Sequence, residues 1–151
     1  MKRFFLAISI SLFVGLLGEL TLAANPTHME KLKSTKNCAR CNLSAASLVG
    51  LNLSRAKLMG ADMSGARLRG ANLRGADLSG ANLSGAELRR VNLRGARMSR
   101  ANLSNANLRG ANLRGADLRG AVLNGADFKG AILKDAKLDG ATGGKLDGAE
   151  M

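Results

Sequence analysis

The residues best suited to chemistry lie near the start of the chain, where Cys38 and Cys41 form the motif C-A-R-C and His28 is the only histidine. Such a cysteine pair can form a structural disulfide, remain as two small buried thiols, or carry redox or metal chemistry. Thioredoxin-like chemistry requires the pair at a helix N-terminus within a βαβ unit, which this sequence does not predict. A zinc site requires four ligands, and these residues supply at most three. The disulfide is favoured, and the other two interpretations stay open.

Other patterns resemble catalytic motifs without completing them. The segment 140–145 hints at a phosphate-binding loop, but Asp139 stands where the Walker pattern requires Gly, and Leu146 where it requires Ser or Thr. Carboxylates recur at one fixed position of the repeat described below, so they do not indicate paired acid–base catalysis. We therefore predict that the protein is not an enzyme and has no catalytic residues, no cofactor and no metal site.

Most of the chain is one five-residue repeat, which determines where all of these residues lie. From Cys41 to Gly140 the centre of every five is large and apolar in all 20 cases, beginning with Leu43. Two residues before the centre stands Ala in 17 fives, and one residue before it stands Asn or Asp in 12. Gly follows two residues after the centre in 14. A fixed short period of this kind is typical of repeat architectures.

A period of five fits neither an α-helix nor a straight strand. On a helix, successive leucines would step by about 140° and occupy every side. On a straight strand, an odd period would point alternate leucines to opposite faces. A chain that turns once per five residues instead directs every centre to a common axis, and Gly, Asn and Asp suit the turns. The sequence therefore predicts an all-β solenoid.

The fives resemble the pentapeptide repeat family, whose motif is A-[DN]-L-x-G; the segments 71–75 and 76–80 match it closely. The resemblance implies a right-handed quadrilateral parallel β-helix with four fives per coil, and hence about five coils over residues 41–140. Some exported members are similar in having a C-x-x-C directly before the first repeat. Many members have no assigned activity, and the best-known ones bind type II topoisomerases as mimics of DNA.

The regions flanking the repeats are expected to cover its ends. Residues 25–40 form a polar linker and N-terminal cap, in which Thr27 and Glu30 fit a capping box at the start of a short helix that ends near Ser34. In the repeat frame Cys38 holds a centre position and Cys41 an Ala position, so both are expected to point toward the axis. Residues 141–151 form an irregular C-terminal end, because the pattern restarts three residues late.

With four fives per coil, residues 20 apart stack on the same face, and the residue after each centre points outward. The serine face carries Ser44, Ser64, Ser84, Ser104 and Asn124. The first basic face carries Val49, Arg69, Arg89, Arg109 and Lys129, and the second basic face carries Ser54, Arg74, Arg94, Arg114 and Lys134. The mixed face carries Met59, Ser79, Ser99, Arg119 and Asp139.

The eight Arg and Lys residues of the two basic faces are the candidate anion-binding residues. Like charges on adjacent strands destabilise a sheet, so a ladder of them favours a role in binding an extended anion. The alternative is that coils duplicated as units and copied their arginines, which leaves a basic but merely soluble surface. Both interpretations stay open at this point.

The N-terminal segment predicts export. Lys2 and Arg3 precede an apolar run over residues 4–17, and small residues follow at Ala23 and Ala24, as in a secretory signal peptide over residues 1–24. The apolar run is shorter than the roughly 20 residues that span a bilayer, so no membrane span is expected after cleavage. The predicted location is periplasmic or secreted, or the thylakoid lumen in a cyanobacterium.

Charge restricts the partners. The chain has 23 Lys and Arg against 11 Asp and Glu, a net charge of +12, and no Trp or Tyr. Three of its four Phe lie in the first thirteen residues, which leaves only Phe128 further on, so we expect no site that stacks bases on aromatic rings. A mimic of DNA must be acidic, which this chain is not. We expect a structural or interaction scaffold that binds anionic lipid, an envelope glycan or an acidic protein. DNA or topoisomerase binding is the alternative if the signal segment is retained, and redox chemistry at the cysteine pair is a third.

Overall fold

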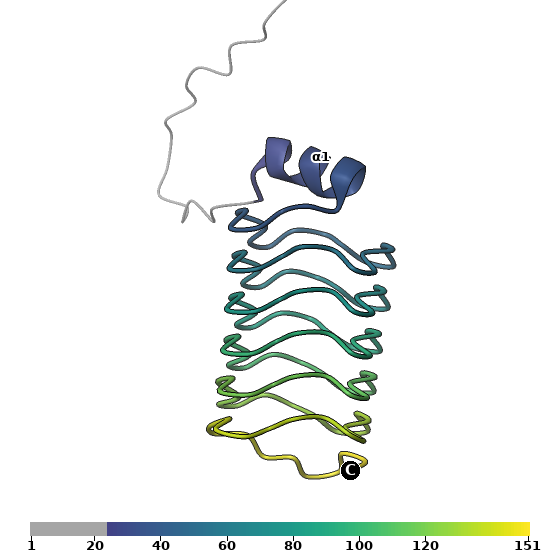
Figure 1. Cartoon of the computed structure of the whole chain (residues 1–151), viewed down its shortest axis with the longest axis vertical. Coiled ribbons are helices and arrows are strands. Elements are labelled where there is room, and N and C mark those ends of the chain that lie inside the picture. Colours follow the sequence, from purple (N-terminus) through teal and green to yellow (C-terminus); the bar gives the residue numbers. More distant parts are fainter. Residues whose placement is uncertain (1–23) are drawn as a thin grey trace, which may run out of the picture.

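A computed structural model describes residues 24–151 as a column of stacked coils with a helix lying across its N-terminal end (Figure 1). Helix α1 spans Pro26–Thr35, and within residues 24–151 the strands are reduced to single paired residues, too short to be named. The predicted signal peptide lies outside the described residues except for Ala24. In this part of the chain no helix is both long and apolar enough to cross a bilayer.

The register between coils is 20 residues. Asn72 pairs in parallel with Asn92, and Asn92 pairs with Asn112. The Leu73 N–H donates to the Asn92 carbonyl at 2.8 Å, and the Asn92 N–H donates to the Ala71 carbonyl at 3.0 Å. Four fives therefore complete one coil, and the predicted right-handed quadrilateral β-helix is confirmed.

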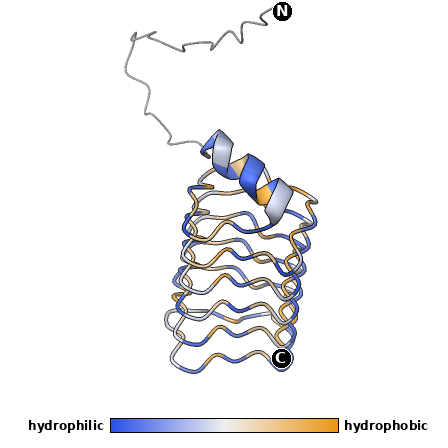
Figure 2. Cartoon of the chain, turned by 45° about the horizontal axis from the view of Figure 1, so that its top comes forward, coloured by the Kyte–Doolittle hydropathy of each residue, from blue (hydrophilic) through white to orange (hydrophobic). Residues whose placement is uncertain are grey.

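The core is a column of repeat centres. Every centre residue from Cys38 to Leu133 is buried, and so is the residue two before it except at Lys36 and Leu51. The polar residues between them face outward, so apolar and polar segments alternate along every coil (Figure 2). Alanine suits the second inward position because its small side chain leaves the axis to the larger centres.

Each corner of a coil is a tight turn with a left-handed residue. The Ala76 N–H donates to the Leu73 carbonyl at 3.0 Å, which closes a turn over Arg74 and Gly75. Gly75 has φ +64°, as the second central residue of a type II turn requires. The Asn72 side-chain oxygen accepts the Arg74 N–H at 3.1 Å, which explains the preference for Asn or Asp before each centre.

The corners keep this conformation where glycine is absent. Six fives place another residue there, and each has a φ between 53° and 63°: Ala45, Arg55, Arg90, Arg100, Asn105 and Asp135. A residue with a Cβ is strained in this region by roughly 1–2 kcal/mol. The fold therefore tolerates strained backbone at several corners, and these corners carry side chains that glycine would lack.

Replacing Arg90 with glycine is expected to raise the free energy of unfolding by about 1 kcal/mol, because it removes the strain of a left-handed residue with a Cβ. The reverse change, Gly85→Ala, is expected to lower it by about 1 kcal/mol. A Cβ at Gly85 would meet no atom within 4 Å, so the loss reports the backbone alone. Thermal denaturation followed by circular dichroism measures both; two unchanged melting temperatures would contradict the assigned turn geometry.

The predicted capping box at the start of the helix is wrong. The N-cap is Asn25, whose side-chain oxygen accepts the backbone N–H of Thr27 at 3.0 Å and its hydroxyl at 2.6 Å. Pro26 occupies the first helical turn, where its fixed φ fits and its missing N–H costs no hydrogen bond. Asparagine is also a stronger N-cap than threonine, so the helix begins before the box.

The repeat also extends beyond the predicted limits at both ends. Pairing begins at Asn37, one five earlier than the frame from residue 41. At the other end the irregularity is a shortening: Val122 pairs with Thr142 at the usual spacing of 20, but Asp127 pairs with Lys145, 18 residues on. Ile132 keeps the new spacing with Glu150. The chain thus omits two residues on one face and then resumes regular pairing.

Candidate functional site

The 20-residue register aligns the basic side chains in two ladders. The Gly75 N–H donates to the Arg94 carbonyl and the Gly95 N–H to the Arg114 carbonyl, at 3.0 and 2.9 Å, which fixes the vertical order of these coils. All eight candidate anion-binding residues are exposed. At the usual sheet spacing, successive rungs of a ladder attach to backbones about 4.8 Å apart.

Only one rung is neutralised. The Arg109 guanidinium donates to the Asp127 carboxylate at 3.2 Å, while the other seven candidate residues have no ion pair within residues 24–151. The pKa of Asp127 lies below its ordinary value, mainly because the backbone N–H of Lys129 donates a hydrogen bond to this carboxylate. The hydrogen bond from the Arg109 side chain lowers this pKa further. The two basic faces therefore carry a largely uncompensated positive charge.

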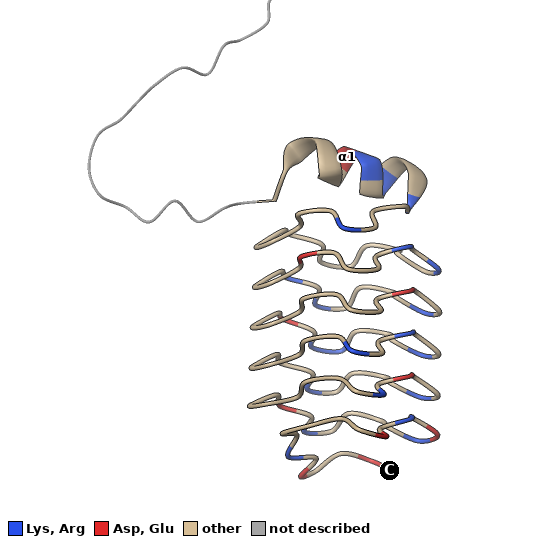
Figure 3. Cartoon of the chain, turned by 60° about the vertical axis from the view of Figure 1, so that its left-hand side comes forward, with Lys and Arg blue, Asp and Glu red and all other residues tan. Residues whose placement is uncertain are grey.

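The mixed face differs because its arginines have acidic neighbours. Arg119 donates twice to Asp117, at 2.9 and 2.7 Å, and this side-chain bond is the main cause that lowers the pKa of Asp117 to about 2. Arg97 lies 3.9 Å from Asp77. Lys and Arg recur at matching places from coil to coil, with acidic residues interspersed at some of them (Figure 3). Charge of one sign accumulates only on the two basic faces.

The serine face forms a hydrogen-bonded surface of its own. The Asn102 amide donates to the Asn82 side-chain oxygen at 3.4 Å, and the Asn82 amide donates to Asp62 at 3.1 Å. The backbone N–H of Ser104 also donates to the Asn102 side chain. These amides stabilise neighbouring coils, so this face carries polarity without an excess of charge.

A groove that the repeat pattern did not predict runs along the corner beside the second basic face. It is lined by Ser54, Arg55, Asn72, Arg74, Gly75, Arg94 and Gly95. Arg55 stands in the corner column at a position that glycine usually fills, and glycine follows in the next two coils. The sequence signal for it is Arg55, an arginine at a corner that glycine occupies in the next two coils, a pattern that Arg90 and Arg100 share.

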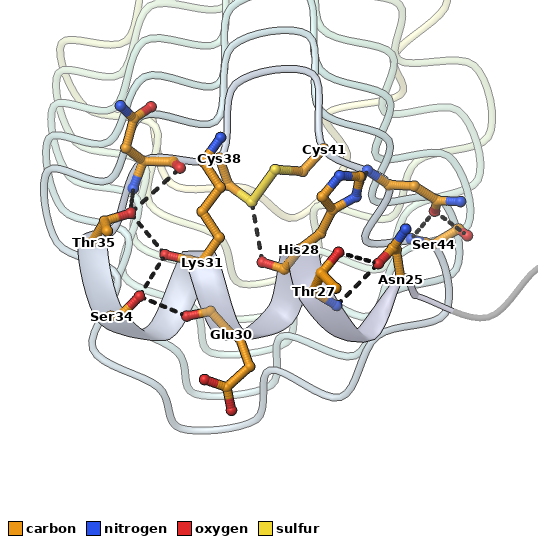
Figure 4. The surroundings of a disulfide bond; sticks show 12 residues. Asn25, Thr27, His28, Glu30, Lys31, Ser34, Thr35, Cys38, Cys41 and Ser44 are labelled. Carbon is orange, nitrogen blue, oxygen red and sulfur yellow. Dashed lines mark hydrogen bonds between the residues drawn. A yellow bond between two sulfur atoms is a disulfide. The ribbon is translucent and has the colours of Figure 1, made fainter. Parts of the chain in front are cut away.

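Cys38 and Cys41 lie beneath helix α1, at the mouth of the column (Figure 4). They are 0% and 3% exposed, in the centre and Ala positions that the repeat frame predicts. In the structure their sulfur atoms form a disulfide bond, with the Cα atoms 5.2 Å apart. Buried in this way, the bond is poorly placed for exchange with a partner thiol.

His28 has a structural role in the same region. Its Nδ1 accepts the backbone N–H of Asn42 at 3.0 Å, and its carbonyl oxygen lies 3.3 Å from the Cys38 sulfur (Figure 4). Asn25 adds a backbone hydrogen bond from its N–H to the Asn42 carbonyl. These contacts attach α1 to the first coil. Among residues 24–151, no three His, Cys, Asp or Glu side chains group closely enough to hold a metal ion.

Solved structures of similar proteins share this architecture. A pentapeptide repeat protein from the thylakoid lumen of Arabidopsis thaliana is 35% identical, with a TM-score of 0.65 over 68% of this chain and 72% of its own. The pentapeptide repeat protein Rfr23 from the cyanobacterium Cyanothece is 28% identical, with a TM-score of 0.51 over 82% of this chain and 97% of its own.

A third structure supports the fold alone. QnrB1, a plasmid-mediated fluoroquinolone resistance protein, is 23% identical, with a TM-score of 0.56 over 76% of this chain and 66% of its own. Among curated proteins, none matches the chain. The sequence model of pentapeptide repeats, in eight copies, matches residues 37–75, 71–110 and 106–142. With the 20-residue register and the buried centres, this match establishes that the chain belongs to the pentapeptide repeat family.

Proposed function

We propose that the protein is an exported, non-enzymatic scaffold whose two basic faces bind an extended anionic component of the cell envelope. The observation that carries the proposal is the pair of aligned ladders, in which seven of eight basic side chains lack an ion pair within residues 24–151. Stacked like charges weaken a sheet, so a bound anion that relieves the repulsion stabilises it.

The ladder also fits the envelope better than a cytoplasmic target. A mimic of DNA must present negative charge, whereas this chain has a net charge of +12. Direct binding of nucleic acid matches the sign, but the chain has no Trp or Tyr, and Phe128, the one Phe within residues 24–151, is buried and cannot stack on a base. The similar Arabidopsis protein comes from the thylakoid lumen, a compartment reached by export, which supports an extracytoplasmic location for this one.

Removing the three arginines of the second basic face tests the binding surface. Each arginine near an anionic membrane contributes about 1 kcal/mol, so the triple variant Arg74→Ser, Arg94→Ser, Arg114→Ser is expected to bind anionic vesicles about 100-fold more weakly at low salt. Wild-type affinity is expected to fall steeply as salt rises. Cosedimentation with phosphatidylglycerol vesicles measures both, and the same assay with an acidic envelope polymer extends it to glycans.

The mixed face supplies a matched control. The triple variant Arg97→Ser, Arg100→Ser, Arg119→Ser removes the same number of charges from another side of the column, and two of its arginines already pair with Asp77 and Asp117. We expect its affinity to stay within about 3-fold of wild type. Equal losses of vesicle affinity in the two triple variants would mean that binding depends only on net charge. Unchanged affinity in the variant of Arg74, Arg94 and Arg114 would contradict the proposed binding surface.

The intact mass of the protein from its own host tests export and the disulfide together. We expect a mass that lacks residues 1–23 or 1–24, and no reaction of Cys38 or Cys41 with an alkylating reagent before reduction. Treatment with a reductant under denaturing conditions should then add two alkyl groups. A mass that retains the N-terminal segment, with two free thiols, would contradict export and favour the alternative of a nucleic-acid or topoisomerase partner.

A further inference from the structure

The groove beside the second basic face exists because two corners carry no side chain. Gly75 and Gly95 follow Arg55 down one corner column of the solenoid, and their missing side chains leave the groove open. The Arg55 Cγ lies 3.7 Å from where a Cβ on Gly75 would stand. The side chain of Arg55 therefore runs down over the glycine of the next coil, toward the ladder of Arg74 and Arg94.

Three arginines line this groove and no acidic residue does. Arg55, Arg74 and Arg94 come from three successive coils, and none of them has an ion pair within residues 24–151. The groove on the mixed face has a different character. It is lined by two arginines, Arg100 and Arg119, of which Arg119 is held by Asp117. Met59, which is 50% exposed, forms part of its wall.

This arrangement suits one class of anion. A guanidinium presents a planar fork of donors that matches phosphate oxygens, and a phosphate monoester has three terminal oxygens and up to two negative charges to share among several forks. A carboxylate offers two oxygens and one charge. The hydroxyl of Ser54 adds a further hydrogen-bonding group to the wall.

We propose that the groove formed by Arg55, Arg74, Arg94 and the bare corners at Gly75 and Gly95 is a specific site for a phosphate monoester group. The inference rests on the proposed function, since it identifies one point on the basic faces where an anionic partner is held by geometry as well as by charge. The phosphate belongs either to a lipid headgroup or to a soluble phosphate ester.

The corner position of Arg55 provides an unusually clean test. Because Arg55 has φ 58°, Arg55→Gly relieves backbone strain, and the variant is expected to melt no lower than wild type. Arg90→Gly is the matched control: it makes the same change at φ 54°, on a corner where Arg90 likewise lies over a glycine, Gly110. Both variants lose one charge.

Binding of glycerol phosphate is measured by calorimetry at constant ionic strength. We expect Arg55→Gly to weaken it about 10-fold or more and Arg90→Gly to change it less than 2-fold, while Arg55→Lys, which keeps the charge but loses the fork, recovers only part of the affinity. Equal effects of the two glycine variants, or full recovery by lysine, would overturn the site. So would displacement of the phosphate by chloride at equal ionic strength.

The source of the phosphate is distinguished with vesicles. Tighter binding to phosphatidic acid than to phosphatidylglycerol vesicles, lost in Arg55→Gly, indicates a lipid headgroup; binding of glycerol phosphate alone indicates a soluble ester. The test is independent of the ladder experiment. If vesicle binding depends on Arg74, Arg94 and Arg114 but not on Arg55, the proposed function stands and the groove fails. If glycerol phosphate binds in the groove while vesicles and envelope polymers do not bind, the phosphate site stands and the proposed function fails.

Discussion

Replacing Leu93 with alanine is expected to lower the free energy of unfolding by about 2–5 kcal/mol. Leu93 is fully buried, and Leu73 and Leu113 hold the same position in the coils on either side. Backbone hydrogen bonds on both sides fix the distance between coils, so the column cannot close around the cavity. The lost packing is therefore expected to fall in the upper part of this range.

Chemical denaturation followed by circular dichroism measures the change. The neighbouring variant Arg94→Ala, at an exposed position of the same five, is the control and is expected to shift stability by less than about 0.5 kcal/mol. A loss below about 0.5 kcal/mol for the leucine variant itself would mean that the side chain does not fill the axis.

Loosening the helical cap is expected to expose the disulfide. Leu32 of α1 is fully buried in the same core cluster as Cys38 and Cys41, and no other residue of the helix is. Leu32→Ala is expected to lower the free energy of opening the cap by about 2–5 kcal/mol. The rate at which dithiothreitol reduces the Cys38–Cys41 bond should then rise by roughly 30-fold or more.

The reduction is followed by mass spectrometry after quenching with an alkylating reagent. Leu32→Met, which conserves volume, is the control and should leave the rate within a few-fold of wild type. Equal rates for wild type and Leu32→Ala would show that the thiol reagent reaches the bond without movement of α1. That result would contradict the protective role of the cap, although the solenoid itself would be unaffected.

The solenoid could be predicted in detail because each residue of the five has one role. The centre is large, the residue two before it is small, the Asn or Asp between them accepts a corner N–H, and the corner is left-handed. Together these roles exclude an α-helix and a straight strand and favour a chain that turns once per five residues. The 20-residue register is what the resemblance to the pentapeptide repeat family implies, and the structure has it. The placement of Arg74 above Arg94 and Arg114 follows from that register. Periodicity determines the backbone, and the backbone determines which side chains share a face.

Features that depend on a departure from the repeat could not be predicted in the same way. The helix begins at Asn25 because one residue caps better than another nearby, a difference of local hydrogen bonding that periodicity does not report. The shortening before Lys145 changes the spacing between paired residues from 20 to 18, and a regular repeat does not predict such a change. The groove depends on the direction of the Arg55 side chain over Gly75, which the repeat pattern does not specify.

The register of 20 has a consequence for how the length of this chain can change. Inserting one extra five between Arg74 and Arg94 would preserve every buried centre and every corner, so the column would still fold. All later residues would, however, rotate by a quarter turn, and Arg94 and Arg114 would no longer lie below Arg74. Only insertions or deletions of whole coils keep the ladders continuous, so the fold accepts changes in steps of five while its charged surface accepts them in steps of 20.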